Sequence, residues 1–250
     1  MFQRLAKIHE TLLDREHLVI NVTVDPGIMP DVLQSLEGFT GKLPNPGNFS
    51  AKEWQPTALP RSEALTAPSQ VNYVGCSANL FDAGYTMHGS ALVITRYLQT
   101  AWLWEKIRVQ GGAYGGMCSF DQRSGTFVFA SYRDPSLAAS LEVYKATGDY
   151  LANLTLSEDE LTRALIGAIG QLDAYQLPDA KGYSSAMRHL LDYTDEERQQ
   201  LRDEVLATTQ EHFNAFGKTL NKAFEQPVVS VLCSPEAAAK AGLETKTKVL

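Results

Sequence analysis

Cysteine is scarce in this sequence, and long apolar runs are missing. Only Cys76, Cys118 and Cys233 occur among 250 residues, and no C-x-x-C pair is present. The odd count and wide spacing favour neither a disulfide framework nor a zinc cage, so we expect three reduced, partly buried thiols. No apolar stretch approaches the roughly 18 residues that cross a bilayer, so we expect no membrane partner.

Positive charge is scarce as well. The 22 Lys and Arg residues against 29 Asp and Glu residues give a net charge of −7. Nucleic-acid binding needs clustered cations, so no nucleic-acid partner is expected, whereas an acidic wall could attract basic peptides. The amphipathic start at residues 1–8 leads straight into Glu10, Asp14 and Glu16. It has neither the apolar centre of a secretory signal nor the acid-poor character of a transit peptide, so we expect no targeting segment in this chain.

The sequence also contains no complete catalytic motif. H-E-x-x-H, H-x-x-E-H, G-x-S-x-G and the P-loop pattern are all missing. His9 and His17 are eight residues apart and so do not share one helical turn, and His88, His189 and His212 are isolated in sequence. The run from Gly111 to Gly116 leaves a helix instead of entering one, which is the wrong geometry for a phosphate site. We therefore predict no metal ligands in this chain.

Hydrophobic periodicity predicts alternating strands and helices in the first half and mostly helices after Pro135. A capping box at Ser157 opens one helix, and Thr194 and Thr208 begin two more S/T-x-x-E patterns. In residues 125–132, Thr126, Val128 and Ala130 alternate with Phe127, Phe129 and Ser131, as in a sheet with one covered face. Strands are expected at residues 17–24, 71–79, 117–120, 125–132 and 228–233, and helices at 3–16, 31–40, 90–107, 137–154, 157–175 and 184–191.

These elements predict an α+β fold, with a mixed, mostly antiparallel sheet and helices layered on one face. The adjacent strands at 117–132 form a hairpin, which excludes a purely parallel sheet. Residues 43–69 contain five prolines and little periodicity, and we interpret them as a long surface connection. No linker divides the chain, so residues 1–250 are predicted to form a single domain.

Arg108 and Tyr114 are the candidate site residues, with Gly111 and Gly112 between them. The glycines let a backbone approach a ligand closely, the guanidinium supplies several donors, and the phenol donates to a carbonyl that gains negative charge. An alternative interpretation is purely structural. In it, Arg108 complements the helix dipole, Gly111 is the C′ residue, and Tyr114 packs in the core.

Three sequence blocks resemble the presequence proteases, which are pitrilysin-type (inverzincin) zinc metallopeptidases. The blocks are LWEKIRVQGGAYGG at 103–116, SYRDP at 131–135, and DAYQLPDAKGYSS at 173–185 followed by RHLL at 188–191 and TDEER at 194–198. Together they span about residues 85–205, in the order found in the family's last domain. The similarity is greatest to plant and algal organellar members.

The resemblance implies a role for the site residues. In that family, four similar α+β domains form two halves that close around an unfolded peptide. Zinc is held by the first domain, and the last domain contributes an Arg and a Tyr six residues apart. By resemblance, Arg108 and Tyr114 bind the substrate carbonyl and stabilise the oxyanion beside zinc. The resemblance also implies targeting presequences as substrates, the N-terminal catalytic half as partner, and the mitochondrial matrix or chloroplast stroma as compartment.

The sequence departs from the family because the zinc motif lies outside it, so this chain alone is predicted to be inactive. Two other functions stay open: a non-catalytic module that binds peptides or a partner, and a structural core-like subunit of a processing peptidase. Trp102 and Trp104 are predicted to lie in the core. Residues 176–185 are read as an inter-helix loop in which Pro178 breaks a helix and Gly182 adopts positive φ, with a contribution to the chamber wall as the alternative.

Overall fold

The computed structural model describes residues 1–13, 15–44, 53–57, 60–243 and 245–246. Internal contacts divide the chain into two compact units: Met1–Thr57 with Tyr175–Thr194, and Ala58–Ala174 with Asp195–Leu250. The division joins segments that are far apart in sequence. A single domain over residues 1–250 remains a prediction.

The first unit is helical. It contains α1 (Phe2–Leu12), a short 3₁₀ turn η1 (Pro26–Ile28), α2 (Met29–Thr40) and α6 (Pro178–Leu190). Gly182 of α6 packs against Thr23, where an added Cβ would lie 1.7 Å from the Thr23 Oγ1 atom. The prediction of a strand at residues 17–24 is wrong, because residues 18–24 form neither helix nor strand. Their β-branched composition indicates extended backbone, but a strand also requires a pairing partner.

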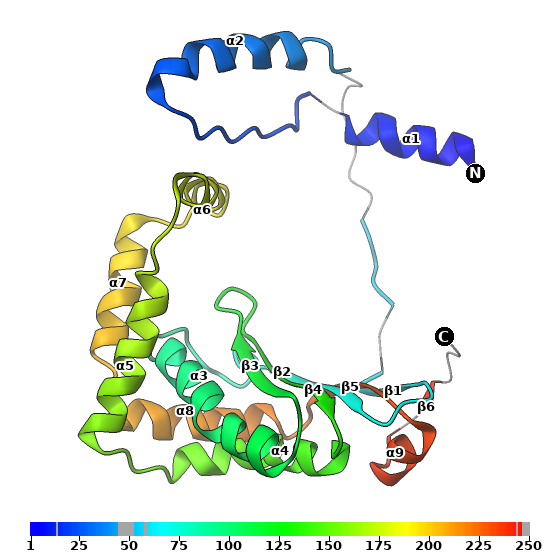
Figure 1. Cartoon of the computed structure of the whole chain (residues 1–250), viewed down its shortest axis with the longest axis vertical. Coiled ribbons are helices and arrows are strands. Elements are labelled where there is room, and N and C mark those ends of the chain that lie inside the picture. Colours follow the sequence, from blue (N-terminus) through cyan, green and yellow to red (C-terminus); the bar gives the residue numbers. More distant parts are fainter. Residues whose placement is uncertain (14, 45–52, 58–59, 244, 247–250) are drawn as a thin grey trace. The chain divides into compact units, whose positions relative to one another are not determined.

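The second unit is built on one six-stranded sheet with the order β3-β4-β2-β5-β1-β6 (Figure 1). The β3–β4, β4–β2 and β2–β5 pairs are antiparallel, and β5–β1 and β1–β6 are parallel. The sheet is therefore mixed and mostly antiparallel, as predicted. Its strands are β1 (Ser62–Thr66), β2 (Asn72–Asn79), β3 (Gly115–Phe120), β4 (Thr126–Asp134), β5 (Val228–Cys233) and β6 (Thr245–Lys246).

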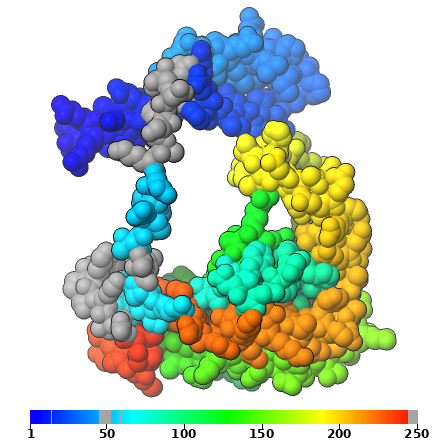
Figure 2. Space-filling model, turned by 180° about the vertical axis from the view of Figure 1, so that it is seen from behind, coloured from blue at the N-terminus to red at the C-terminus, as the bar shows by residue number. Residues whose placement is uncertain are grey.

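The helices of this unit cover one face of the sheet, and the core lies between the two layers (Figure 1). Phe127, Phe129 and Ser131 of β4 point into the core, while Val128 and Ala130 are only partly buried. In the space-filling view, α8 (orange) crosses the unit beside α3 (blue-green) (Figure 2). The helices are α3 (Ser90–Thr100), η2 (Trp104–Gln110), α4 (Leu137–Ala152), α5 (Glu158–Leu172), α7 (Asp195–Leu206), α8 (Gln210–Ala223) and α9 (Pro235–Lys240).

Part of the predicted surface connection at residues 43–69 belongs to the sheet. Residues 62–66 form β1, whose Ala64 is fully buried and opposite Val231 of β5. The prediction failed there because prolines flank the strand on both sides and only five residues show alternation. Residues 45–52 and 58–59 of the same segment lie outside the described residues. Among the helices that the structure describes, none is long and apolar enough to span a membrane.

Candidate functional site

The helix that leads to the candidate site changes its winding before it ends. The sequence predicted one helix over residues 90–107, but α3 stops at Thr100 and the chain continues as the π-helix η2 from Trp104 to Gln110. Such wide turns are rare and often occur at functional sites. Here the π-turn places Trp104 and Arg108 on the same exposed side.

Arg108 lies between two aromatic rings. Its guanidinium carbon is 4.3 Å from the centre of the Trp104 ring and 5.8 Å from the centre of the Tyr114 ring. Stacking of this kind holds a planar cation while leaving its N–H groups available to a ligand. Trp104 is 48% exposed, so the prediction that it belongs to the core is wrong. Trp102 is partly buried, stacks on Tyr150 and donates to the Thr147 hydroxyl.

Tyr114 is a surface residue with a fixed backbone. Its side chain is 65% exposed, which rules out the interpretation in which it packs in the core. Its N–H donates to the carbonyl oxygens of Tyr132 at 3.1 Å and Arg133 at 3.4 Å. Its ring contacts the Tyr132 ring edge to face, with centroids 5.8 Å apart. Because the backbone is held on one side and the ring on another, the phenol projects from a defined position.

The glycines between Arg108 and Tyr114 allow a tight exit from η2. An added Cβ on Gly111 would lie 2.6 Å from the Ile107 carbonyl oxygen, and one on Gly116 would lie 2.7 Å from the Ile107 side chain. Gly112 adopts φ +78°, so Gly112 and not Gly111 is the left-handed residue after the helix. A contact of Gly111 or Gly112 with substrate stays a prediction.

A strained β-bulge supports the Tyr114 side of the site. The register of β2 and β4 shifts between Asn72 and Val74, so Tyr132 and Arg133 both lie opposite Tyr73. Arg133 has φ +49°, which is unusual for a residue with a side chain. Bulges re-aim side chains and are frequent beside active sites. This one presents the two carbonyl groups that Tyr114 binds.

The bulge is anchored by the buried Asp134. Its carboxylate accepts hydrogen bonds from the hydroxyls of Ser131 and Ser140, both at 2.5 Å, and from the Ser136 N–H at 2.7 Å. Asn72 donates to the Asp134 carbonyl oxygen at 2.7 Å. The SYRDP block is therefore mainly a structural support for the strand end beside Tyr114.

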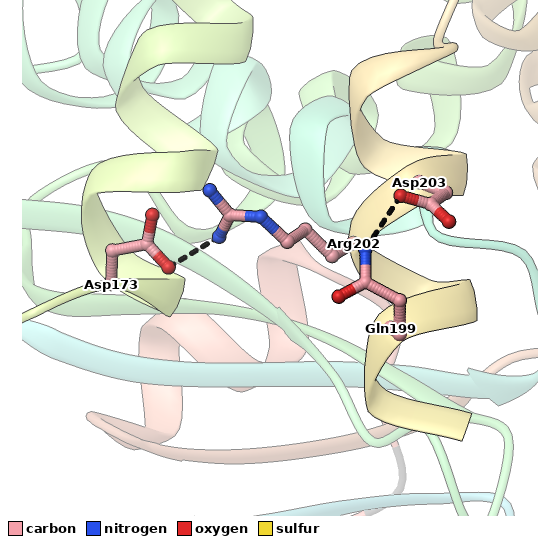
Figure 3. A network of polar contacts seen from close by, with 4 residues as sticks. All are labelled: Asp173, Gln199, Arg202 and Asp203. Carbon is pink, nitrogen blue, oxygen red and sulfur yellow. Dashed lines mark hydrogen bonds and ion pairs between the residues drawn. The ribbon is translucent and has the colours of Figure 1, made fainter. Parts of the chain in front are cut away.

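The third block runs from the end of α5 into α6, and a contribution of this block to a chamber wall stays a prediction. Pro178 begins α6, and Gly182 lies inside that helix without a positive φ, so the prediction of an inter-helix loop with a left-handed Gly182 is wrong. Pro is well suited to the first helical turn, where its missing N–H costs nothing. Asp173, just after α5, pairs with Arg202 of α7, while Gln199 donates to Asp203 at 2.8 Å (Figure 3).

Two histidines that are isolated in sequence meet in the fold. The rings of His88 and His212 are stacked, with centroids 4.6 Å apart. Burial and the nearby charge of His88 lower the pKa of His212. Nothing in the local sequence signalled this pair, because its members lie 124 positions apart. In the part of the chain that the structure describes, no group of three or more His, Cys, Asp and Glu residues could hold a metal ion.

The exposed pair of Arg108 and Tyr114 can bind an oxygen acceptor. A guanidinium and a phenol on the same side of one loop provide N–H and O–H donors for a carbonyl or an oxyanion. Sequence reasoning found both residues but missed Tyr73 and Tyr132 beside them. The alternation of β4 did contain a signal for Tyr132, since it continues the series of Thr126, Val128 and Ala130 on the uncovered face.

Comparisons with known proteins agree on the family. Residues 62–234 match the family model described as the PreP C-terminal domain. Presequence protease 1, chloroplastic/mitochondrial, of Arabidopsis thaliana is 43% identical over 232 residues, which are 93% of this chain and 22% of that protein. The mitochondrial presequence protease of Saccharomyces cerevisiae is 29% identical over 81% of this chain and 21% of its own length.

Solved structures share the fold at low sequence identity. Pitrilysin matches with a TM-score of 0.54 and 15% identity, over 88% of this chain and 25% of that one. An inactive peptidase M16 domain from Pseudomonas fluorescens matches with a TM-score of 0.55 and 17% identity, over 82% of this chain and 51% of that one. By sequence, the chain spans about a fifth of the length of these two presequence proteases.

Proposed function

The chain belongs to the family of presequence protease C-terminal domains, and from that premise we propose that it is the substrate-binding domain of a zinc metalloendopeptidase. In this proposal the substrates are short unfolded peptides, such as targeting presequences after their removal. Arg108 and Tyr114 bind the carbonyl oxygen of the peptide bond that is cleaved. The active enzyme needs the N-terminal catalytic half, and it works in the mitochondrial matrix or chloroplast stroma.

The observation that carries the proposal is the exposed pair itself. Arg108 and Tyr114 are both exposed, with the guanidinium carbon 5.8 Å from the phenol ring. The guanidinium carries a permanent charge, and the phenol donates without adding a second charge. Both groups are held before substrate arrives, Arg108 by Trp104 and Tyr114 by the bulge. Donors fixed in advance stabilise developing negative charge most effectively.

Zinc belongs to the proposal only as part of the larger enzyme. The described residues contain no group that fits a metal site, so the ligands are expected outside this chain. The chain's own contribution is to bind the carbonyl oxygen, orient the peptide and stabilise the charge that develops on that oxygen. We expect the 250-residue chain alone to cleave nothing, and chelator-sensitive cleavage by the purified chain would contradict this division.

The test uses the full-length parent protease with Tyr114→Phe and Arg108→Ala. Removing one donor from an oxyanion site costs about 10²–10³-fold in kcat, and we expect losses of that order with little change in Tm. Tyr175→Phe is the matched control, because Tyr175 is 83% exposed. If kcat/KM of both site variants stays within about twofold of the unmodified enzyme, a difference under ~0.5 kcal/mol, the assigned roles are wrong.

A further inference from the structure

Three tyrosine rings form a row on the uncovered face of the sheet. The centroid of the Tyr114 ring is 5.8 Å from that of Tyr132, which is in turn 5.3 Å from that of Tyr73, and both contacts are edge to face. Tyr132 is 39% exposed and Tyr73 is 36% exposed. The row therefore extends from the proposed carbonyl-binding residue across β4 to β2.

The uncovered face around this row carries no charge in strands β2, β3 and β4, apart from Arg133 at the bulge. The residues that share the face with the tyrosines are small or apolar and leave the rings accessible. Arg133 places its guanidinium carbon 5.6 Å from the centre of the Tyr132 ring. The neighbours on this face are Gly75, Ser77, Met117, Val128, Ala130 and Leu232.

The strained backbone at the bulge lies next to the row of tyrosine rings. Arg133 at φ +49° and the register shift opposite Tyr73 place both residues of the bulge beside Tyr114. A left-handed conformation in a residue other than glycine persists only where the surrounding structure imposes it, and such residues cluster at ligand sites. Here the buried Asp134 holds the bulge. The tyrosine row is thus a fixed surface.

We propose that Tyr73 and Tyr132 form a subsite for an aromatic or aliphatic side chain of the bound peptide, next to the residue whose carbonyl Arg108 and Tyr114 hold. This inference rests on the proposed function. In an extended peptide, side chains on one face repeat about every 6.6 Å, close to the spacing of the rings along the row. The proposed occupant is therefore an extended peptide whose alternate side chains lie on successive rings.

Charge decides which side chains fit. Arg108 and Arg133 stack near the two ends of the Tyr114–Tyr132 contact, at 5.8 Å and 5.6 Å from the respective rings. A Lys or Arg side chain at the subsite would meet two like charges, whereas a Phe or Leu side chain would gain ring contact at no electrostatic cost. The subsite should therefore favour apolar side chains and disfavour basic ones.

The experiment measures cleavage of matched peptides by the full-length parent protease. Peptides of one sequence carry Phe, Ala or Lys at one of the two residues next to the one whose carbonyl is held, which are the second residue before and the first residue after the scissile bond. The measured quantity is the ratio of kcat/KM for the Phe peptide to kcat/KM for the Ala peptide. Tyr132→Thr and Tyr73→Thr remove the ring but introduce a β-branched residue that suits a strand. Tyr132→Phe keeps the ring, and Tyr175→Thr is the control.

We expect a ratio of about five or more at one of the two positions, falling to near one in Tyr132→Thr and Tyr73→Thr. Tyr132→Phe and Tyr175→Thr should keep the ratio, and the Lys peptide should be the poorest substrate of the unmodified enzyme. General damage to the fold lowers kcat/KM for the Phe and Ala peptides by the same factor and leaves their ratio unchanged. A ratio unchanged in both Thr variants overturns the subsite, and it is the result expected if another part of the parent protein covers this face.

The outcome separates the subsite from the proposed function. If Tyr114→Phe lowers kcat/KM equally for the Phe and Ala peptides while the ratio is insensitive to Tyr132 and Tyr73, the carbonyl-binding role stands and the subsite is wrong. If the ratio falls in the Thr variants but Tyr114→Phe has no effect, the row binds peptide side chains and the catalytic role of Tyr114 is wrong.

Discussion

Replacing Asp134 by Ala should destabilise the second unit and loosen the loop that presents Tyr114. Asp134 is fully buried, and its carboxylate accepts three hydrogen bonds from Ser131, Ser136 and Ser140. Alanine removes the acceptor for all three donors. Ser131 and Ser140 are themselves buried, so water cannot replace the carboxylate without opening the strand end.

The magnitude follows from the donors that are left. Each buried donor without an acceptor costs about 1–3 kcal/mol, and the two hydroxyls can rotate toward weaker partners, which favours the low end for them. The carboxylate charge strengthens each hydrogen bond, and the desolvation cost recovered on its removal offsets this gain, so the three donors set the net loss. We therefore expect a net loss of about 3–5 kcal/mol. For a unit of this size, that lowers Tm by about 6–20 °C.

Thermal unfolding followed by circular dichroism measures the effect. Asp134→Asn retains one acceptor oxygen and should lose less than half as much stability. Asp203→Ala is the surface control, because Asp203 is exposed on α7, and it should stay within about 0.5 kcal/mol. A loss below 1 kcal/mol in Asp134→Ala would show that the three hydrogen bonds do not hold the bulge.

Three further predictions concern the core and the histidine pair. Burial lowers the pKa of His212, with the charge of His88 as a second cause, so the unfolded chain takes up the proton first as pH falls. The contribution of His212 to the free energy of unfolding is fully present above about pH 6.5 and decreases as the pH falls below it. His212→Gln should therefore flatten this acid limb of Tm measured from pH 5 to 8. Gly217→Ala should cost about 1–3 kcal/mol in urea unfolding, because its Cβ would lie 2.4 Å from the Ala152 nitrogen. Gly170→Ala, which meets nothing within 4 Å, should instead stabilise α5 by about 0.5–1 kcal/mol, and equal effects at the two positions would contradict the packing. Burial raises the pKa of the Cys76 thiol to about 12 and also raises the pKa of the Cys118 and Cys233 thiols. A thiol reagent should therefore label these three cysteines only after denaturation. Fast labelling of the native chain would refute their burial.

Features set by neighbouring residues were predictable from the sequence. The Ser157 capping box is present as expected, with the Ser157 hydroxyl accepting from the Glu160 N–H and the Glu160 carboxylate accepting from the Ser157 N–H. The box predicted at Thr208 lies one residue later, at Thr209, where His212 takes the part of Glu. The alternation of β4 likewise predicted its buried face. Each of these signals depends on a few consecutive residues.

Features set by long-range register were not predictable. Residues 62–66 form strand β1 because they pair with β5, which lies more than 160 residues later in the chain. The meeting of Tyr73 with Tyr132 depends on the bulge in the β2–β4 register, and that of His88 with His212 on how α8 packs. Propensity and periodicity carry no information about such partners. The local pattern did single out Arg108 and Tyr114, but it left a structural interpretation open, and only the resemblance implied a role for the pair.

The tyrosine row and its bulge are better explained by binding than by folding. A left-handed residue with a side chain costs about 1–3 kcal/mol, and Arg133 keeps this cost where a glycine would avoid it. Trp104, Tyr114 and Tyr132 remain exposed, so their rings contribute less burial to the core than their size allows. A fold selected only for stability would remove both costs. Their coincidence beside the loop that carries Arg108 supports the proposed contact of this surface with a bound peptide.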